Sequence, residues 1–196
     1  MPKVGMEPIR RLQLIEATLD SVAELGLSAT TINSISQRAG MSSGIISHYF
    51  GGKQVLIEAT VRHLLSSLKY NLLAKTQAGC TAEQRLMFIV EANFSHIQQK
   101  FSITRTWLSF WAQSMHDESL HRLQVVNAKR LNSNLACSFR QYMNQEQALE
   151  AASLTAAMID GLWLRAVLAK SNESEFRKAE LQAKQYVLSL ISVRGA

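Results

Sequence analysis

The sequence of 196 residues is poor in cysteine, proline and glycine. Its two cysteines, Cys80 and Cys137, cannot form a disulfide framework, and they lack the paired spacing of a zinc site. No stretch approaches the ~20 consecutive apolar residues that a membrane span needs. No apolar run of signal-peptide length precedes or follows Arg10-Arg11. These features argue against a membrane protein and a secreted disulfide-rich protein, and we expect a cytoplasmic protein in a reducing compartment.

The net charge of +6 invites the interpretation that the protein binds nucleic acid. The first 62 residues carry six Lys or Arg side chains and five Asp or Glu side chains, so most of the excess charge lies further along the chain. Net charge reports on solubility and association rates, and here it is a weak indicator of function.

Apolar residues recur at helical spacing along almost the whole chain, and no segment of useful length alternates with the two-residue period of a strand. Gly26, Gly40 and the pair Gly51-Gly52 predict helix ends, and Thr81 with Gln84 predicts a capping box. We therefore expect an all-α fold of about nine helices. The first predicted helix ends near residue 25. The other predicted helices cover about 31–39, 42–49, 53–75, 81–97, 101–115, 117–143, 146–169 and 173–193. A capping box of Asn172 with Glu175 is predicted to open the last of them.

Residues 30–50 predict two short helices joined by a turn at Gly40, which is the construction of a helix-turn-helix. In this motif the second helix enters the major groove and the first braces it. Ile46 and Phe50 would anchor the second helix in the core. Its remaining residues carry small or hydrogen-bonding side chains, so the helix can approach base edges closely. This face is typical of a helix that reads DNA.

The run from Thr31 to Phe50, with the Gly-Met-Ser turn, Gly44, the Tyr49-Phe50 end and Lys53 three residues beyond, resembles the DNA-binding domain of the TetR family of repressors. One residue departs from the family pattern, because many members carry tyrosine where this chain has Ser47. The resemblance implies a helix-turn-helix domain over residues 1–52, with its motif at about 31–50. It implies a helical ligand-binding and dimerisation domain over residues 53–196.

For contacts to DNA we expect base reading by Ser43, Ile45, Ser47 and His48, with Ile45 meeting a thymine methyl. Thr31 caps a helix and also stands where a helix N-terminus favours phosphate. The resemblance implies phosphate contacts for Tyr49 and Lys53. Arg10 and Arg11 either attract DNA without specificity or form an exposed helix face. The predicted DNA-binding residues are Thr31, Ser42, Ser43, Gly44, Ile45, Ser47, His48, Tyr49 and Lys53.

Trp107, Phe110, Trp111 and Met115 fall on one helical stripe, which most often means core packing. Asp160 and Trp163 share a face of an otherwise apolar helix, and a carboxylate there is costly to bury without a partner. A quaternary ammonium ion would suit this set, because aromatic faces and a carboxylate both attract it. The predicted ligand-binding residues are Trp107, Phe110, Trp111, Asp160 and Trp163.

Four segments together resemble a choline-sensing branch of the TetR family, which represses genes for choline transport and glycine betaine synthesis. These segments are residues 1–6, 44–50, 107–112 and 159–165. The resemblance implies choline as the effector, a palindromic operator in double-stranded DNA, and a homodimer formed by the last two helices. The apolar residues of these helices must serve both the core and the interface: Leu149, Leu154, Met158, Leu162, Leu181, Val187, Leu188 and Ile191.

No arrangement of nucleophile and base, phosphate loop or carboxylate pair stands out, so we expect no catalytic residues and no cofactor. His116 and His121 are five residues apart, off a shared helical face, and we expect surface residues rather than a metal site. Two alternatives remain open. One is a TetR-type repressor that answers to another organic cation, for example one controlling an efflux pump. The other is a small all-helical enzyme or carrier that uses the aromatic residues.

Overall fold

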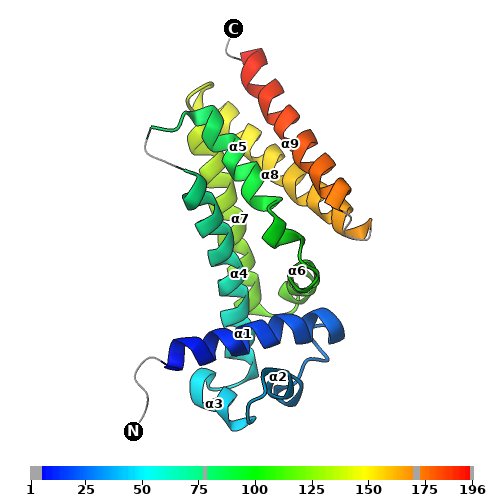
Figure 1. Ribbon diagram of the computed structural model, residues 1–196. Coiled ribbons are helices and arrows are strands. Elements are labelled where there is room, and N and C mark those ends of the chain that lie inside the picture. The colour runs from blue at the N-terminus through cyan, green and yellow to red at the C-terminus, as the bar shows by residue number, and fades with distance from the viewer. Residues whose placement is uncertain (1–5, 77–78, 170–172, 195–196) are drawn as a thin grey trace. The chain divides into compact units, whose positions relative to one another are not determined.

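The computed structural model describes residues 6–76, 79–169 and 173–194, and all regular structure within these ranges is helical (Figure 1). This confirms the predicted all-α fold. The elements are α1 (Met6–Leu25), α2 (Ile32–Ala39), α3 (Gly44–Phe50), α4 (Lys53–Lys75), α5 (Ala82–Asn93), the 3-10 helix η1 (His96–Gln99), α6 (Phe101–Ser114), α7 (Glu118–Phe139), α8 (Gln145–Leu168) and α9 (Glu173–Arg194).

The chain forms two compact units. Unit 1 comprises Met1–Ser66 and Lys100–Gln124, and unit 2 comprises Ser67–Gln99 and Val125–Ala196. The helices α4 and α7 therefore contribute one part to each unit. This division reflects how the helices pack. The boundary predicted from the sequence, after Gly52, separates a DNA-binding domain from a ligand-binding and dimerisation domain, and it stays a prediction.

Three predicted helix limits differ from the structure. The segment predicted to be helical through Ile97 leaves the α-helix after Asn93 and continues as η1, because Phe94 and Ile97 keep helical spacing although the backbone changes. The helix predicted over 42–49 begins at Gly44, since Ser42 and Ser43 belong to the turn. The helix predicted to reach residue 143 ends at Phe139. Asn172, predicted to open the last capping box, lies outside the described residues.

Unit 1 is organised around a core to which α1, α2, α3 and α4 all contribute. Its buried residues are Leu14, Ala17, Ile35, Ile46, Phe50 and Leu56. An ion pair between Glu24 and Arg38 joins the end of α1 to α2. The helix α6 packs against α1, where the Thr106 hydroxyl lies 3.4 Å from the carbonyl oxygen of Leu19. The recognition helix and the aromatic helix α6 are thus both supported by α1.

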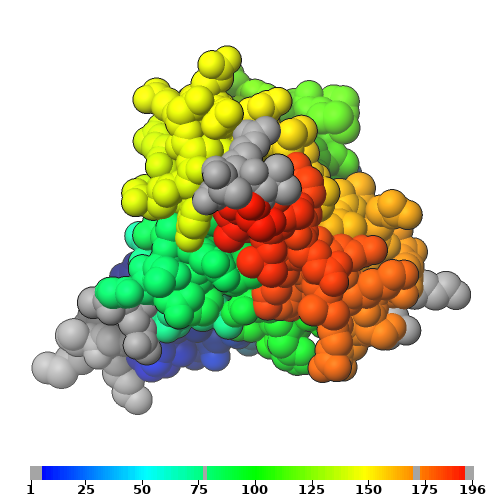
Figure 2. All heavy atoms as spheres, turned by 90° about the horizontal axis from the view of Figure 1, so that it is seen from above, coloured from blue at the N-terminus to red at the C-terminus, as the bar shows by residue number. Residues whose placement is uncertain are grey.

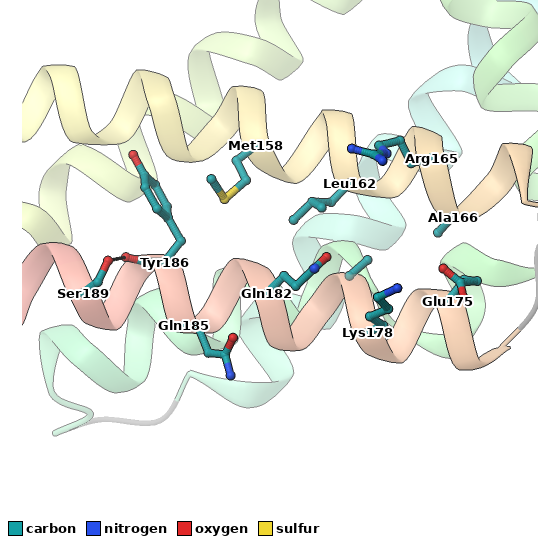
Figure 3. A pocket seen from close by; sticks show the side chains of 11 residues that line it. Met158, Leu162, Arg165, Ala166, Glu175, Lys178, Gln182, Gln185, Tyr186 and Ser189 are labelled. Carbon is teal, nitrogen blue, oxygen red and sulfur yellow. Dashed lines mark hydrogen bonds between the residues drawn. The ribbon is translucent and has the colours of Figure 1, made fainter.

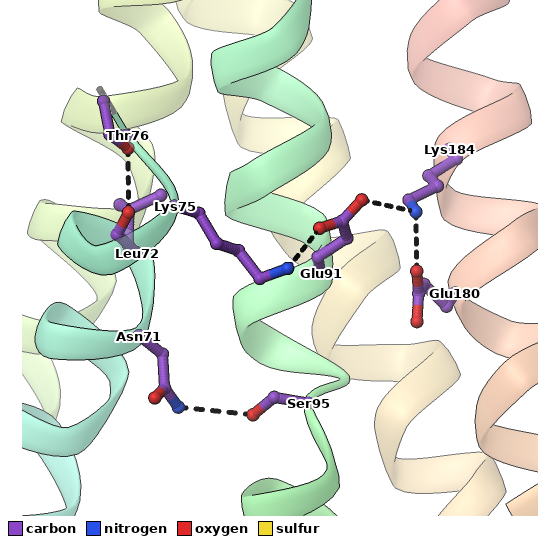
Figure 4. A network of polar contacts seen from close by, with 8 residues as sticks. All are labelled: Asn71, Leu72, Lys75, Thr76, Glu91, Ser95, Glu180 and Lys184. Atoms are coloured by element: carbon purple, nitrogen blue, oxygen red, sulfur yellow. Dashed lines mark hydrogen bonds and ion pairs between the residues drawn. The ribbon is translucent and has the colours of Figure 1, made fainter. Parts of the chain in front are cut away.

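In unit 2, α8 packs against α9, and α5 packs against both. Glu91 on α5 stands at the centre of a polar network, with one carboxylate oxygen 2.6 Å from Lys75 of α4 and the other 2.8 Å from Lys184 of α9 (Figure 4). Burial alone would raise the pKa of Glu91, but the hydrogen bonds from the two lysines outweigh it and lower the pKa. The network fixes three helices of unit 2 at one point.

By length and mean hydropathy, α8 would be long and apolar enough to cross a membrane. The core helix of a soluble protein passes the same test. Here α8 packs against α5 and α9 and buries nine residues, among them Ala152, Ile159 and Trp163. This packing accounts for part of its apolar character, while Leu149, Leu154 and Leu168 of the same helix are exposed.

Candidate nucleic-acid interface and effector site

The helix-turn-helix is built by α2, a short turn and α3. Thr31 caps α2 as the sequence predicts: its hydroxyl accepts the N–H of Ser34 at 3.0 Å, and the Ser34 hydroxyl accepts the N–H of Thr31 at 2.9 Å. Gly40 ends α2 with φ 62° and returns its N–H to the carbonyl of Gln37. Because this left-handed conformation is strained for residues with a Cβ, the glycine allows the reversal between the two helices.

The helix α3 has one buried side and one exposed side. Ile46 and Phe50 are buried in the core of unit 1. Ile45 is half-buried and packs against that core, so only part of its side chain is available to a base. The predicted DNA-facing residues that are exposed are Ser42, Ser43, Gly44, Ser47 and His48. Their side chains are small or hydrogen-bonding, which suits contact with base edges in a major groove.

The predicted phosphate contacts lie at the borders of this face. Thr31 is exposed at the start of α2, and Lys53 is half-buried at the start of α4. Tyr49 is half-buried, and its ring centroid lies 4.9 Å from that of His48. Thr31 and Lys53 flank α3 and Tyr49 lies in its last turn, but contact with phosphate stays a prediction for all three.

Arg10 and Arg11, for which the sequence allowed either attraction of DNA or an exposed helix face, make different contacts in the structure. The Arg11 guanidinium donates a hydrogen bond to the carbonyl oxygen of Tyr49 and lies 4.4 Å from the ring centroid of Phe50. Arg10 bonds only Gln13, at 3.4 Å on its own helix, among the contacts of the described residues. No local sequence pattern predicts the Arg11 contact, because the two residues that it joins are 38 positions apart.

The aromatic residues predicted to meet the ligand on α6 form one cluster in unit 1. The ring of Trp107 lies 5.8 Å from Phe110 in an edge-on arrangement and 6.1 Å from Trp111. Phe110 and Trp107 are buried, at 1% and 4% exposure, and Trp111 is half-buried. Phe110 therefore serves as a core residue in this structure, and Trp111 is the member with accessible surface.

The two predicted ligand residues on α8 belong to unit 2. Trp163 is buried, and Asp160 lies one turn before it, at the border of the helix's buried side. Asp160 is exposed, yet the surrounding protein displaces enough water to raise the pKa of its carboxyl group to about 6. Desolvation is the cause of this shift, because neighbouring protein disfavours the charged form of the carboxyl group.

A polar contact joins the first turn of α4 to the start of α7 within unit 1. The amide nitrogen of Gln54 donates to the Asp117 carboxylate at 2.9 Å and lies 3.1 Å from the Ser119 hydroxyl. Asp117 also accepts from the Ser119 hydroxyl at 2.7 Å and from the Leu120 N–H at 3.0 Å. The hydrogen bonds from Ser119 and Leu120 are the main cause of a lowered pKa for Asp117, so its carboxylate stays ionised and accepts the bond from Gln54.

Within the described residues, no group of three His, Cys, Asp or Glu side chains is arranged to hold a metal ion. His116 and His121 are both exposed.

The sequence relationships match this geometry. Residues 82–192 match the family described as BetI-type transcriptional repressor, C-terminal, and residues 14–60 match the tetR family of bacterial regulatory proteins. The HTH-type transcriptional regulator BetI of Burkholderia lata is 53% identical over 170 residues, covering 86% of this chain and 88% of that protein. BetI of Burkholderia mallei is 48% identical over 196 residues, covering 99% and 100%.

The chain belongs to the BetI-type repressors of the TetR family.

Solved structures carry the same fold. A transcriptional regulator from Rhodococcus superposes with a TM-score of 0.79 at 19% identity, covering 95% of this chain and 98% of that one. A regulator from Saccharomonospora viridis, solved in complex with choline, superposes with a TM-score of 0.78 at 20% identity, covering 92% and 96%. The relatives of this BetI-type chain are DNA-binding transcriptional regulators and not enzymes.

TetR-type regulators dimerise, and the structure of this BetI-type chain divides the apolar residues of its last two helices between core and surface. Val187 and Ile191 are buried within unit 2. Leu149, Leu154, Leu181 and Leu188 are exposed, and Met158 and Leu162 are half-buried. About half of the set is thus on the surface, where it is available to a partner.

A groove of about 580 Å³ runs between α8 and α9 in unit 2 (Figure 3). Met158 and Leu162 line it from α8, while Lys178, Gln182 and Tyr186 line it from α9. Seen from above, the orange and red atoms of α9 lie beside those of α8 (Figure 2). At 3.6 residues per turn, Asp160 points from the opposite side of α8, so this groove and the predicted ligand residues are separate features.

Proposed function

We propose that this protein is a choline-responsive repressor of genes for choline transport and glycine betaine synthesis. It works in the cytoplasm as a homodimer on a palindromic operator, and choline releases it from DNA. Two recognition helices related by a twofold axis read two half-sites, which supplies the specificity that one seven-residue helix lacks.

The observation that carries the proposal is the state of Asp160. Desolvation disfavours its carboxylate, and its pKa is raised to about 6 without a compensating ion pair among its causes. At neutral pH the group is still mostly ionised, so a cation that reaches it gains Coulomb attraction. A monovalent organic cation is the ligand class that this site favours.

Choline fits the neighbouring chemistry better than an ammonium ion that donates hydrogen bonds. Its quaternary nitrogen has no N–H group, so aromatic faces and a carboxylate are its natural partners, at ~0.5–2 kcal/mol for each good cation–π contact. Trp163 is one turn from Asp160 on α8. The sequence predicts that three residues of α6 join Asp160 and Trp163 around the ligand: Trp107, Phe110 and Trp111. The choline complex of the Saccharomonospora viridis regulator supports the choice of ligand.

The packing of α6 in unit 1 supports release from DNA as the response to the ligand. It packs directly against α1, which also supports α3, and the α6–α7 connection bonds Gln54 at the start of α4. A ligand that shifts α6 would therefore move both α1, which packs against α3, and the start of α4, which follows α3 in the chain. A coupling free energy of ~1–3 kcal/mol would weaken operator binding about 5- to 150-fold, and choline and operator would weaken each other by the same factor.

Calorimetric titration of choline into the wild-type protein and into Asp160→Asn and Trp163→Ala variants tests this proposal. We expect binding to the wild type and a marked loss in both variants. A parallel titration with larger lipophilic cations distinguishes a choline sensor from a regulator of an efflux pump. Choline affinity equal to wild type in both variants would refute the site, and preference for the larger cations would refute the effector.

A further inference from the structure

We propose that Arg11 is a positioning residue for operator binding, acting by fixing the end of the recognition helix rather than by contacting DNA. The inference rests on DNA binding, which the family establishes, and is independent of choline. Its basis is one guanidinium that meets the last turn of α3 at two points.

The recognition helix needs outside support at its end. It has seven residues, and helices below about 12 residues are marginal on their own. The carbonyl groups of a helix's last turn have no partner within the helix and carry partial negative charge. Its N-cap residue Ser43 makes no side-chain capping bond, so the helix has no such support at its other end.

Arg11 supplies that support from α1. Its guanidinium donates to the Tyr49 carbonyl, which lies in the last turn of α3, and its cation offsets the negative end of the helix dipole. The same group lies over the ring of Phe50, the residue that anchors α3 in the core. Glu7, 3.5 Å away and one turn earlier on α1, orients the guanidinium. The exposed His48 directly precedes the residue whose carbonyl is held.

Only an arginine fits this arrangement. A planar guanidinium donates in its own plane while stacking its face on a ring, whereas a lysine ammonium is a point charge with neither property. Charge alone therefore does not reproduce the contact. Arg10 provides a matched comparison, because it has the same charge, neighbours Arg11 in sequence, and bonds only within α1 among the described contacts.

The experiment compares wild type, Arg11→Ala, Arg11→Lys and Arg10→Ala without choline. Each is titrated, as the full chain, with a labelled duplex from upstream of its own gene and with a scrambled duplex of equal length, at several salt concentrations. We expect both Arg11 variants to bind the upstream duplex about tenfold more weakly, since hydrogen bonds to charged groups contribute at this level. Binding to the scrambled duplex and the salt dependence should change little, and Arg10→Ala should behave as wild type.

Three results would overturn the proposal. Wild-type affinity in Arg11→Lys would show that charge suffices. A loss equal on both duplexes, with the slope of log K against log salt reduced by about 0.9, would show a direct phosphate contact. An equal loss in Arg10→Ala would show general attraction. Thermal unfolding of each variant accompanies the titrations, and if Arg11→Ala does not fold, Arg11→Lys decides the question because it keeps the charge beside Glu7.

Discussion

The side-chain amide of Gln54 bonds the carboxylate of Asp117 across 63 positions of sequence. Gln54 stands four residues after the end of the recognition helix, and Asp117 three residues after the end of the aromatic helix α6. The bond therefore joins the segment that follows the recognition helix α3 to the segment that follows α6, within one packed unit. It offers a short physical route between the recognition helix and the proposed effector site.

If the effector acts through this bond, removing it uncouples choline from DNA. We expect Gln54→Ala to bind operator and choline separately much as wild type does. The factor by which choline weakens operator binding should shrink about two- to thirtyfold, which is the range for residues that carry coupling. The measurement is operator affinity by fluorescence anisotropy with and without saturating choline.

Glu58→Ala is the control for Gln54→Ala, because Glu58 pairs with Arg62 at 3.1 Å within the same helix α4. Its choline response should equal that of wild type. A full choline response in Gln54→Ala would show that the effect passes through the packing of α6 on α1 instead.

The raised pKa of Asp160 predicts that choline affinity depends on pH. Below about 6 the carboxyl group is protonated and loses its attraction for a cation, so we expect choline to bind more weakly at pH 5 than at pH 7.5. Asp160→Asn should bind weakly at both pH values. Calorimetry at the two pH values checks this, and equal wild-type affinities at both would contradict a role for the carboxylate.

The same pKa predicts how stability changes with pH in the absence of ligand. A group whose pKa is raised on folding, from 3.8 to about 6 here, stabilises the fold most below 3.8 and loses that contribution as pH rises through 6. Asp160→Asn should therefore melt above wild type at pH 7.5, and this advantage should disappear near pH 4. Thermal unfolding at both values measures the difference, which an Asp160 with an ordinary pKa would not show.

His48 is exposed on α3 and is predicted to read a base edge. We expect His48→Ala to weaken operator binding by ~1–3 kcal/mol, the range for a good base contact, while thermal unfolding stays unchanged. A gel-shift titration measures the loss. His96→Ala, exposed in η1, serves as the control. Unchanged affinity in His48→Ala would remove this residue from the DNA interface.

The exposed leucines of α8 and α9, the two helices that form the groove, are predicted to meet a second copy of the chain. We expect Leu154→Glu and Leu188→Glu to give monomers that keep their helix content, because both side chains are exposed in the isolated chain. Light scattering after size-exclusion chromatography measures the mass, with Leu73→Glu, exposed on α4, as the control. Dimers in both groove variants would place the interface elsewhere.

Local sequence signals predicted local structure well. Thr81 and Gln84 form the predicted capping box, and Gly40 ends α2 at the predicted turn. Where periodicity alone was the guide, at Phe94 and Ile97, the predicted helix ran too far, since apolar spacing does not record where the backbone changes.

Contacts between distant segments could not be predicted. Nothing near Arg11 or Gln54 in the sequence indicates that they meet Tyr49 and Asp117, because these bonds depend on how the helices pack. Asp160, in contrast to Arg11 and Gln54, could be singled out from the sequence, because a carboxylate is uncommon in an otherwise apolar helix. Its raised pKa then gives that irregularity a physical meaning.

The most direct test of the account is the operator dissociation constant measured with and without saturating choline, on a duplex from upstream of the chain's own gene. We predict that choline raises it about 5- to 150-fold, and that bound operator weakens choline by the same factor. A dissociation constant that saturating choline leaves unaltered would contradict the claim that this repressor answers to choline.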